Sequence, residues 1–212
     1  MSDIESQFEP IAHEYAVVEK DAEKSQYELK VNWPSIKSLM PQEPVKVLDY
    51  GCGAGVYSVL MANDGYEVTA IDNSPSILEE FNDSRIVTKK WGYTDKPLSE
   101  TFDLIIAKLV LQFVEDLSGF ALAMRRQLNT GGRLIVSVPH PDKSRLIANG
   151  NREYETLIGI SGLRVTMIHR ELEEYKSTFQ KAGLELLKTD EPFDPKVPKE
   201  TKRLNMLFGV TT

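Results

Sequence analysis

A glycine-rich turn between a strand and a helix constrains this chain more than any other feature of its sequence. Residues 45–50 form a short apolar run, VKVLDY, which predicts a buried strand of a parallel sheet. The run stops at residues 51–55, GCGAG, and residues 56–62 then predict a helix. Glycines adopt backbone angles closed to other residues and let a ligand approach the main chain. Because the following helix offers unpaired N–H groups at its start, this order predicts the beginning of a nucleotide-binding α/β unit.

Length and composition limit the class of protein. A chain of 212 residues with 41% hydrophobic residues is long enough for one domain with a full sheet and its covering helices. The net charge of −7 argues against nonspecific binding to nucleic acid or to an anionic membrane surface. Cys52 is the single cysteine, so no intramolecular disulfide can form and we expect no metal site. The apolar runs are too short to span a bilayer and the first residues are acidic, so we expect a cytoplasmic protein.

The first part of the chain is polar and predicts a helical cap over residues 1–44. Apolar residues at helical spacing favour one amphipathic helix around residues 8–15 and a second over residues 18–29. Pro34 suits the first turn of a third helix over residues 35–40.

Strands and helices alternate in the middle of the chain. We expect strands over residues 45–50, 67–72, 85–89, 102–107 and 133–138, with helices over residues 56–62, 75–81 and 116–128. Strands alternating with helices predict an α/β fold with a doubly wound, Rossmann-like sheet that is mostly parallel.

The order changes after Pro139. Residues 139–162 are expected to be irregular and to carry a lid or a short extra helix, and residues 163–168 are expected to form an added strand. Residues 139–170 as a whole form a candidate lid insertion. A helix over residues 170–182 precedes two strands, 184–189 and 203–210, which a single loop joins. Two strands joined in this way predict a hairpin at the sheet edge, so the last strand is antiparallel. Residues 45–212 are expected to form the Rossmann-like core, and the cap and the core together are expected to form a single domain.

An acidic residue at the end of the second strand indicates the kind of ligand. Asp72 lies about 20 residues beyond Gly51, where a carboxylate commonly accepts both hydroxyls of a ribose. The glycine turn and this carboxylate together predict an adenosine-containing ligand. The dinucleotide fingerprint requires glycine or alanine three residues after its second glycine, but this chain has Val56 there and its third glycine at Gly55.

The G-x-G-x-G spacing, with Asp49 just ahead of it, resembles motif I of the class I S-adenosylmethionine-dependent methyltransferases. VLDYGCGAG, VTAIDNS at 68–74, FDLIIAKLVLQFVED at 102–116 and LNTGGRLIVSVPHP at 128–141 resemble successive motifs of that family, over roughly half of the chain. The chain is similar to the small single-domain members (type 11), which include quinone-biosynthesis methyltransferases. The resemblance implies an enzyme that uses S-adenosyl-L-methionine, releases S-adenosyl-L-homocysteine and methylates a small-molecule acceptor.

The resemblance also implies which residues bind the cofactor. Asp49 would hold its amino group, directly or through water, Asp72 its ribose hydroxyls, and Asn73 and Ser74 would flank the adenosine. The methionine and ribose portions would lie along the turn of Gly51, Cys52, Gly53 and Gly55, and Ala107 and Lys108 after the fourth strand would contribute backbone contacts near the methionine end. Family members often carry an acidic residue near the adenine, where this chain has Trp91, Gly92 and Tyr93, with Asp95 as the nearest acid. Aromatic stacking or backbone hydrogen bonds would replace that contact.

The sequence contains no motif that identifies a general base. His140 is the best polar candidate for a catalytic residue, because it follows the fifth strand at the edge where ligands bind in open α/β sheets. The alternative is a loop histidine bonded to the backbone. The N/D-P-P-Y/W signature of amino-group methylation is absent after the fourth strand, where residues 108–110 are KLV, which argues against an amide or adenine target.

Two other functions remain open from the sequence. An NAD-dependent oxidoreductase shares the fold class, but Val56 and the lack of an obvious hydride-site domain argue against it. A non-catalytic adenosine-ligand-binding protein would explain the missing acid near Trp91 and the missing base. In every case the expected partner is a small molecule, not a membrane or a nucleic acid.

Overall fold

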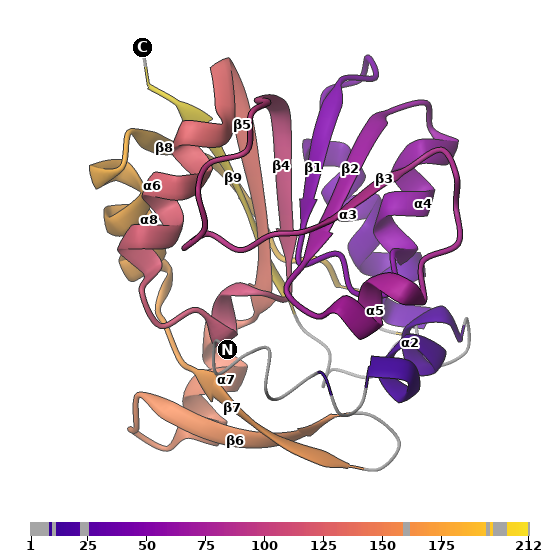
Figure 1. The fold of residues 1–212 in the computed structure, drawn as a ribbon. Coiled ribbons are helices and arrows are strands. Elements are labelled where there is room, and N and C mark those ends of the chain that lie inside the picture. Colours follow the sequence, from indigo (N-terminus) through magenta and orange to yellow (C-terminus); the bar gives the residue numbers. More distant parts are fainter. Residues whose placement is uncertain are drawn as a thin grey trace.

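The fold is centred on one seven-stranded sheet (Figure 1). The computed structural model describes residues 9, 12–21, 26–158, 162–193, 196 and 203–211. The strands of the sheet are β1 (Lys46–Tyr50), β2 (Glu67–Asp72), β3 (Val87–Lys90), β4 (Phe102–Lys108), β5 (Leu128–Pro139), β8 (Leu184–Asp190) and β9 (Arg203–Val210). Their order is β3-β2-β1-β4-β5-β9-β8. Strands β1 to β5 pair in parallel, and β9 runs antiparallel between β5 and β8, so the predicted doubly wound sheet with an antiparallel last strand is confirmed.

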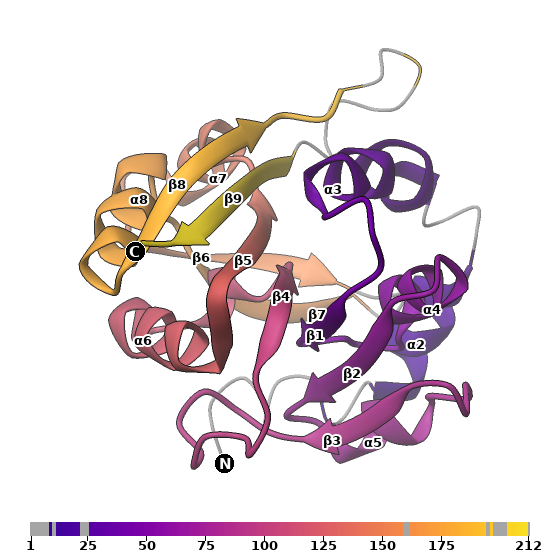
Figure 2. The same cartoon turned by 90° about the horizontal axis from the view of Figure 1, so that it is seen from above.

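Helices cover both faces of the sheet, as Figure 2 shows along the strands. On one face lie α3 (Trp33–Leu39) and α4 (Val56–Asn63), and on the other α6 (Leu117–Gln127) and α8 (Leu172–Lys181). The remaining helical segments are α2 (Ala12–Lys20), a π-helical turn η2 (Glu28–Asn32), α5 (Pro75–Glu79), a 3-10 turn η3 (Leu111–Phe113) and α7 (Pro141–Ala148). Within the described residues, no helix combines the length and the apolar character needed to cross a bilayer.

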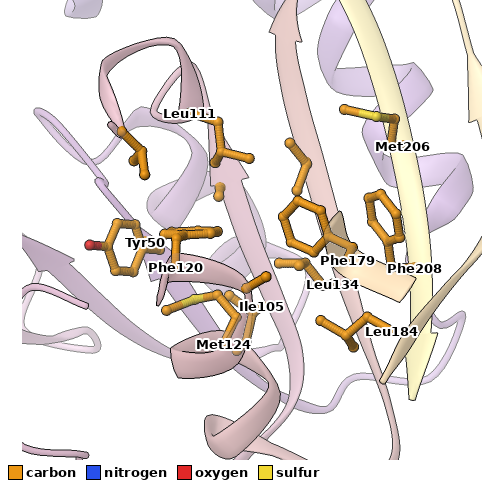
Figure 3. Packing of buried hydrophobic residues seen from close by; sticks show 14 of the residues in the cluster. Tyr50, Ile105, Leu111, Phe120, Met124, Leu134, Phe179, Leu184, Met206 and Phe208 are labelled. Carbon is orange, nitrogen blue, oxygen red and sulfur yellow. The ribbon is translucent and has the colours of Figure 1, made fainter. Parts of the chain in front are cut away.

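Aromatic side chains hold the α6 and α8 layer against the sheet (Figure 3). Phe179 of α8 stacks on Phe208 of β9 with ring centroids 4.6 Å apart. Phe120 of α6 meets Tyr50 of β1 edge to face at 5.2 Å. A second buried cluster joins α3 and α4 to the opposite face. Burial of apolar side chains on both faces makes the sheet a firm support and leaves its carboxyl edge for other contacts.

A separate hairpin lies at the carboxyl edge. Strands β6 (Glu153–Ile158) and β7 (Leu163–Ile168) pair antiparallel with each other and not with the main sheet. Figure 1 places this hairpin, α7 and α2 beyond the ends of β1 and β2. Helix α7 is the short extra helix predicted within residues 139–162, whereas the prediction of irregular structure is wrong at β6. The predicted strand 163–168 exists, but it completes a local hairpin and does not extend the sheet.

Two helix boundaries also differ from the prediction. Helix α2 runs across the predicted break between the first two helices, and η2 continues directly into α3. Residues 22–25, like Phe8 and Ile11 of the first predicted helix, lie outside the described residues. Residues 129–132, which the prediction leaves between a helix and a strand, belong to β5, whose pairing with β4 shifts register between Phe102 and Leu104.

Candidate active site

A cavity of about 690 Å³ opens at the carboxyl ends of β1, β2 and β4, beside the β6–β7 hairpin. This volume is in the range of small-molecule sites. Its lining comes from five places: α2 (Tyr15, Glu19), the β1 turn (Tyr50, Gly51, Gly53), the β2 end (Asp72, Asn73, Ser74, Ile77), the β3 end (Trp91, Gly92, Tyr93, Thr94), and the β4 end with the hairpin (Lys108, Leu109, Val110, Phe113, Val114, Glu115, Glu153, Thr166, Ile168). Ligands of open α/β sheets bind at this edge, where the strand order reverses.

The glycine turn presents bare main chain to the cavity. Gly51 and Gly53 line it with φ angles of 68° and 54°, which favour glycine. A Cβ on Gly51 would lie 2.4 Å from Cγ2 of Val110, and one on Gly53 would lie 2.6 Å from Oε2 of Glu19. Gly55 is the N-cap residue of α4 and lies against the ring of Phe81, and it does not line the cavity. A side chain at either lining glycine would therefore collide with Val110 or Glu19.

Asp72 lies at the tip of β2 with its carboxylate against the cavity. Its Oδ2 accepts the N–H of Gly53 at 3.1 Å, and its Oδ1 accepts the N–H of Ser74 at 3.0 Å. Burial raises the pKa of this carboxyl, and the backbone hydrogen bonds oppose that rise. A carboxylate offers about four lone-pair sites, so two further donors can be accepted. The geometry fits the ribose diol that the sequence predicts.

An aromatic and main-chain wall follows β3. Trp91, Gly92 and Tyr93 line the cavity. The N–H of Tyr93 donates to the hydroxyl of Tyr50 at 3.0 Å, and the N–H of Gly92 donates to the carboxylate of Asp95 at 2.8 Å. Asp95 therefore closes the turn and does not line the cavity. This wall suits a flat heteroaromatic ring bound by stacking and backbone contacts.

An ion pair spans the end of the cavity next to the glycine turn. Oε1 of Glu19 lies 3.2 Å from Nζ of Lys108, and each side chain is 11% exposed. Oε2 of Glu19 accepts the N–H of Ala54 at 2.8 Å. Nζ of Lys108 lies 4.6 Å from the centre of the Tyr57 ring. Lys108 is a predicted site residue, whereas Glu19 is one that the sequence reasoning missed.

Tyr15 and Glu19 lie four residues apart on α2 and both line the cavity. Residues at this spacing share one face of a helix, which was the only sequence signal for their joint position. The sequence pattern favours a core role for Tyr15, but the structure places it against the cavity.

Three predicted cofactor residues lie behind the cavity wall. Asp49 is 2% exposed and accepts a hydrogen bond from the Ser58 hydroxyl, and burial raises its pKa to about 6. Cys52 is buried in the α4-side cluster, and burial raises the pKa of its thiol well above its usual value. Ala107 is buried within β4. None of the three is among the described residues that line the cavity, so direct side-chain contacts with the cofactor are not supported, whereas the water-mediated contact of Asp49 and the backbone contact of Ala107 stay predictions.

His140 also lies outside the cavity lining. It precedes α7, where its Nδ1 accepts the N–H of Asp142 at 3.2 Å, and its Nε2 lies 3.2 Å from Oε2 of Glu191. This position matches the alternative reading of a histidine bonded to backbone. A catalytic role for His140 stays a prediction that this geometry does not support.

The other half of the cavity is formed by the β4 end and the hairpin. Leu109, Val110 and Phe113 contribute apolar surface, and Thr166 and Ile168 of β7 face them. Leu109 has a φ of 57°, an unusual angle for a residue with a side chain, and its N–H donates to the carbonyl of Ser137 at 2.8 Å. Backbone strain of this kind gathers at ligand sites.

Buried Arg170 joins this half of the cavity to the segment after β7. Its guanidinium donates to the carbonyls of Leu111 at 2.7 Å, of Val114, and of Glu115 at 3.2 Å. The loop after β4 and the hairpin are thereby fixed to each other.

Known proteins with similar sequences are methyltransferases. A family described as "Methyltransferase domain" matches residues 48–136. The ubiquinone biosynthesis O-methyltransferase of Pseudomonas putida is 30% identical over 161 residues, which are 70% of this chain and 68% of that protein. The mitochondrial ubiquinone biosynthesis O-methyltransferase of Schizosaccharomyces pombe is 32% identical over 43% of this chain, and the trans-aconitate 2-methyltransferase of Deinococcus radiodurans is 29% identical over 58% of it. The chain spans only 37% and 51% of the lengths of these last two relatives.

Solved structures share the fold. An S-adenosylmethionine dependent methyltransferase of Mesorhizobium loti matches with a TM-score of 0.68 at 20% identity, over 84% of this chain and 97% of that one. The N-methyltransferase NodS of Bradyrhizobium japonicum, in complex with S-adenosyl-L-homocysteine, matches with a TM-score of 0.67 at 16% identity, over 97% of this chain and 100% of that one. The Pseudomonas putida relative, together with the sheet order and the glycine turn at the carboxyl edge, shows the family: the chain belongs to the class I S-adenosylmethionine-dependent methyltransferases.

Proposed function

We propose that this chain is an enzyme that transfers a methyl group from S-adenosyl-L-methionine to a small-molecule acceptor. The observation that carries the proposal is a single cavity with two different walls. One wall is main chain, a carboxylate and aromatic rings at Gly53, Asp72 and Trp91, and the other is apolar surface at Val110 and Phe113. A nucleoside and a second molecule can therefore lie next to each other.

The residues of the first wall fit the cofactor. Asp72 keeps acceptor capacity for the ribose hydroxyls, Gly51 and Gly53 line the cavity beside it, where the chain that joins ribose and sulfur would lie, and residues 91–93 form a surface for the adenine. When bound, the cofactor supplies a methyl group on a positively charged sulfur that is a good leaving group. The chain then has to hold the acceptor in line with that methyl group and to exclude water, which lowers the barrier by several kcal/mol.

The second wall indicates the character of the acceptor. Its centre is apolar, while Glu115 and Glu153 lie at its margin, and Lys108 is the single lysine or arginine among the described lining residues. Carboxylates repel an anionic molecule, so a polyanionic acceptor of the trans-aconitate kind is disfavoured. A neutral ring with a hydroxyl group suits this wall better, and the relatives named for ubiquinone biosynthesis and for demethylmenaquinone support a quinone-type acceptor.

Calorimetric titration and a turnover assay test the proposal. S-adenosyl-L-homocysteine should bind and NAD should not, and S-adenosyl-L-methionine should be consumed with at least one neutral hydroxylated aromatic acceptor. Preferential binding of NAD would contradict the proposal. Tight binding of S-adenosyl-L-homocysteine without turnover of any acceptor in a broad panel would favour the non-catalytic binding protein instead.

The same proposal includes a helical cap over residues 1–44 on a core of residues 45–212, and a cytoplasmic location. The α2 side chains that line the cavity support a covering role for the cap. The single cysteine is in keeping with a reducing compartment. Limited proteolysis with and without S-adenosyl-L-homocysteine tests the cap, which should be protected by the ligand, and cell fractionation tests the location.

A further inference from the structure

We propose that Glu19 and Lys108 together bind the amino-acid end of the cofactor, Glu19 through its ammonium group and Lys108 through its carboxylate. This inference rests on the proposed function and adds a residue from α2 to the cofactor site. It also replaces Asp49, which the resemblance implies for the ammonium group, with an acid from a different element.

The positions of Glu19 and Lys108 in the cavity support this assignment. Glu19 and Lys108 line the cavity next to Gly51 and Gly53, at the end opposite the aromatic wall. Their ion pair of 3.2 Å is 11% exposed on each side, so it lies inside the cavity and not on the protein surface. A cofactor with its ribose at Asp72 has its amino-acid end beside this pair, because Oδ2 of Asp72 bonds to Gly53 N and Oε2 of Glu19 bonds to Ala54 N.

The charges of Glu19 and Lys108 also support the assignment. Burial acts to lower the pKa of Lys108, but the carboxylates of Glu19 and Glu28 outweigh it and raise the pKa, so the side chain is held as a cation. Two buried charges are costly unless each keeps an opposite partner. An ammonium and a carboxylate on one ligand supply such a partner for each, so the protein pair can exchange partners without leaving a charge uncompensated.

Specificity follows from this exchange. An adenosine thioether without the amino-acid end brings no charge to the pair, and it gains only the ribose and adenine contacts. The structure therefore predicts that the full cofactor is preferred over its shortened forms, and that the preference depends on Glu19.

The position of Asp49 makes the assignment to Glu19 stronger. Asp49 is 2% exposed, lies behind the cavity wall and accepts the hydroxyl of Ser58. Glu19 is the acid that the described structure presents to the cavity at this end.

A different role for Glu19 makes the opposite prediction. Its carboxylate accepts the N–H of Ala54, so it could stand where the carboxylate of the cofactor has to lie. In that case removing its charge would strengthen binding of the cofactor. The sign of the effect therefore separates a binding residue from an obstructing one.

Titration calorimetry of the full chain tests the proposal with three ligands: S-adenosyl-L-homocysteine, its decarboxylated form and methylthioadenosine. The wild type should bind them in that order of decreasing affinity. Glu19→Gln should weaken S-adenosyl-L-homocysteine about tenfold or more, because a hydrogen bond between charges is lost, and should leave methylthioadenosine nearly unchanged. Lys108→Met should remove the difference between S-adenosyl-L-homocysteine and its decarboxylated form.

Glu14→Gln is the matched control, because Glu14 lies on the same helix, carries the same charge and does not line the cavity. Its affinities should equal those of the wild type. Circular dichroism and thermal melting check that each variant is folded, and the ligand series on the wild type needs no variant at all.

The outcomes separate the two proposals. The role of Glu19 is overturned if Glu19→Gln leaves the affinity for S-adenosyl-L-homocysteine unchanged or strengthens it. It is also overturned if the substitution weakens the binding of S-adenosyl-L-homocysteine and of methylthioadenosine alike. In each of these cases the wild type still binds S-adenosyl-L-homocysteine, so the proposed function stays intact. Equal wild-type affinity for all three ligands also overturns the inference. Failure of the wild type to bind any adenosine ligand contradicts the proposed function itself.

Discussion

Asp72 shows how one side chain both shapes and fills a ligand site. Its two oxygens accept the N–H groups of Gly53 and Ser74, which fixes the carboxylate and joins the glycine turn to the tip of β2. The lone pairs that remain face the cavity, where ribose hydroxyls can donate to them. Structure and binding therefore depend on the same residue, and a useful experiment has to separate the two.

We expect Asp72→Ala to weaken S-adenosyl-L-homocysteine binding at least about tenfold, since two charge-assisted hydrogen bonds are lost. Asp72→Asn keeps one oxygen acceptor and should have an intermediate affinity. Calorimetry measures the binding, and the thermal midpoint of each variant reports damage to the turn. An unchanged affinity in Asp72→Ala would place the ribose elsewhere.

Buried Asp49 should make the stability of the fold depend on pH. Its pKa is raised to about 6 by burial, whereas in the unfolded chain it is near 3.9. The folded state therefore holds the proton more tightly, and stability falls as pH rises through this window. The difference corresponds to about 3 kcal/mol at most.

Asp49→Asn removes that ionisation, and the amide oxygen can still accept the hydroxyl of Ser58. The variant should lose less stability than the wild type between pH 4 and 7 and be the more stable of the two at pH 7. Urea denaturation across this range measures it, with Glu173→Gln on exposed α8 surface as the control. Parallel pH profiles for Asp49→Asn and the wild type would show that the buried carboxyl does not titrate in this way.

The residues that the sequence predicted best are those whose role depends on local chain. Gly51, Gly53 and Asp72 follow from a turn and a strand end, so their places could be predicted from spacing alone. The burial of the Asp49 side chain behind the cavity wall could not be predicted in this way, because it depends on how β1 packs against Ser58 of α4. Glu19 depends on α2 docking against a turn 35 residues away, and no local pattern contains that contact.

At the scale of elements, the β6–β7 hairpin is held where it can cover the acceptor half of the cavity. Arg170 bonds to three carbonyls of the loop after β4, and its side chain is fully buried. Arg170 therefore joins the loop after β4 to the segment that follows β7.

Arg170→Met should lower the free energy of unfolding by about 3 kcal/mol, because three buried carbonyls lose their donor. Arg164→Met is the control, since Arg164 lies on β7 in an exposed pair with Glu155 and should contribute about 1 kcal/mol or less. Urea denaturation measures both. Equal effects of the two substitutions would mean that the buried bonds do not hold the hairpin in place.

The same elements explain where sequence patterns were insufficient. Strands β1, β2 and β4 are buried in the sheet and show as apolar runs, whereas β6, EYETLI, mixes polar and apolar residues and pairs with β7 outside the main sheet. The apolar residues of β7 predicted a strand, but β6 was not predicted, because pairing in a separate two-stranded sheet does not show in the periodicity of one strand. The β8–β9 hairpin was predictable because its strands carry the apolar pattern of the sheet.

For the whole molecule, two apolar layers fix the sheet and leave chemistry to its carboxyl edge, where the cavity is unevenly charged. Glu19, Asp72, Glu115 and Glu153 line it, against the single cation Lys108 among the described lining residues. Since Glu19 and Lys108 are paired, the remaining carboxylates determine the field that an acceptor meets. We therefore expect selection against anionic acceptors to depend on the whole cavity and not on one contact.

Glu153→Gln tests this field, with Glu155→Gln as a matched control on the same strand, because Glu155 is exposed and does not line the cavity. For a neutral acceptor and its carboxylated analogue, Glu153→Gln should raise the ratio of kcat/KM in favour of the analogue about fivefold, as expected for a charge several ångströms away. The KM for S-adenosyl-L-methionine should stay the same, and added salt should reduce the effect through screening. The same ratio in Glu153→Gln and Glu155→Gln would show that the acceptor does not lie beneath the hairpin.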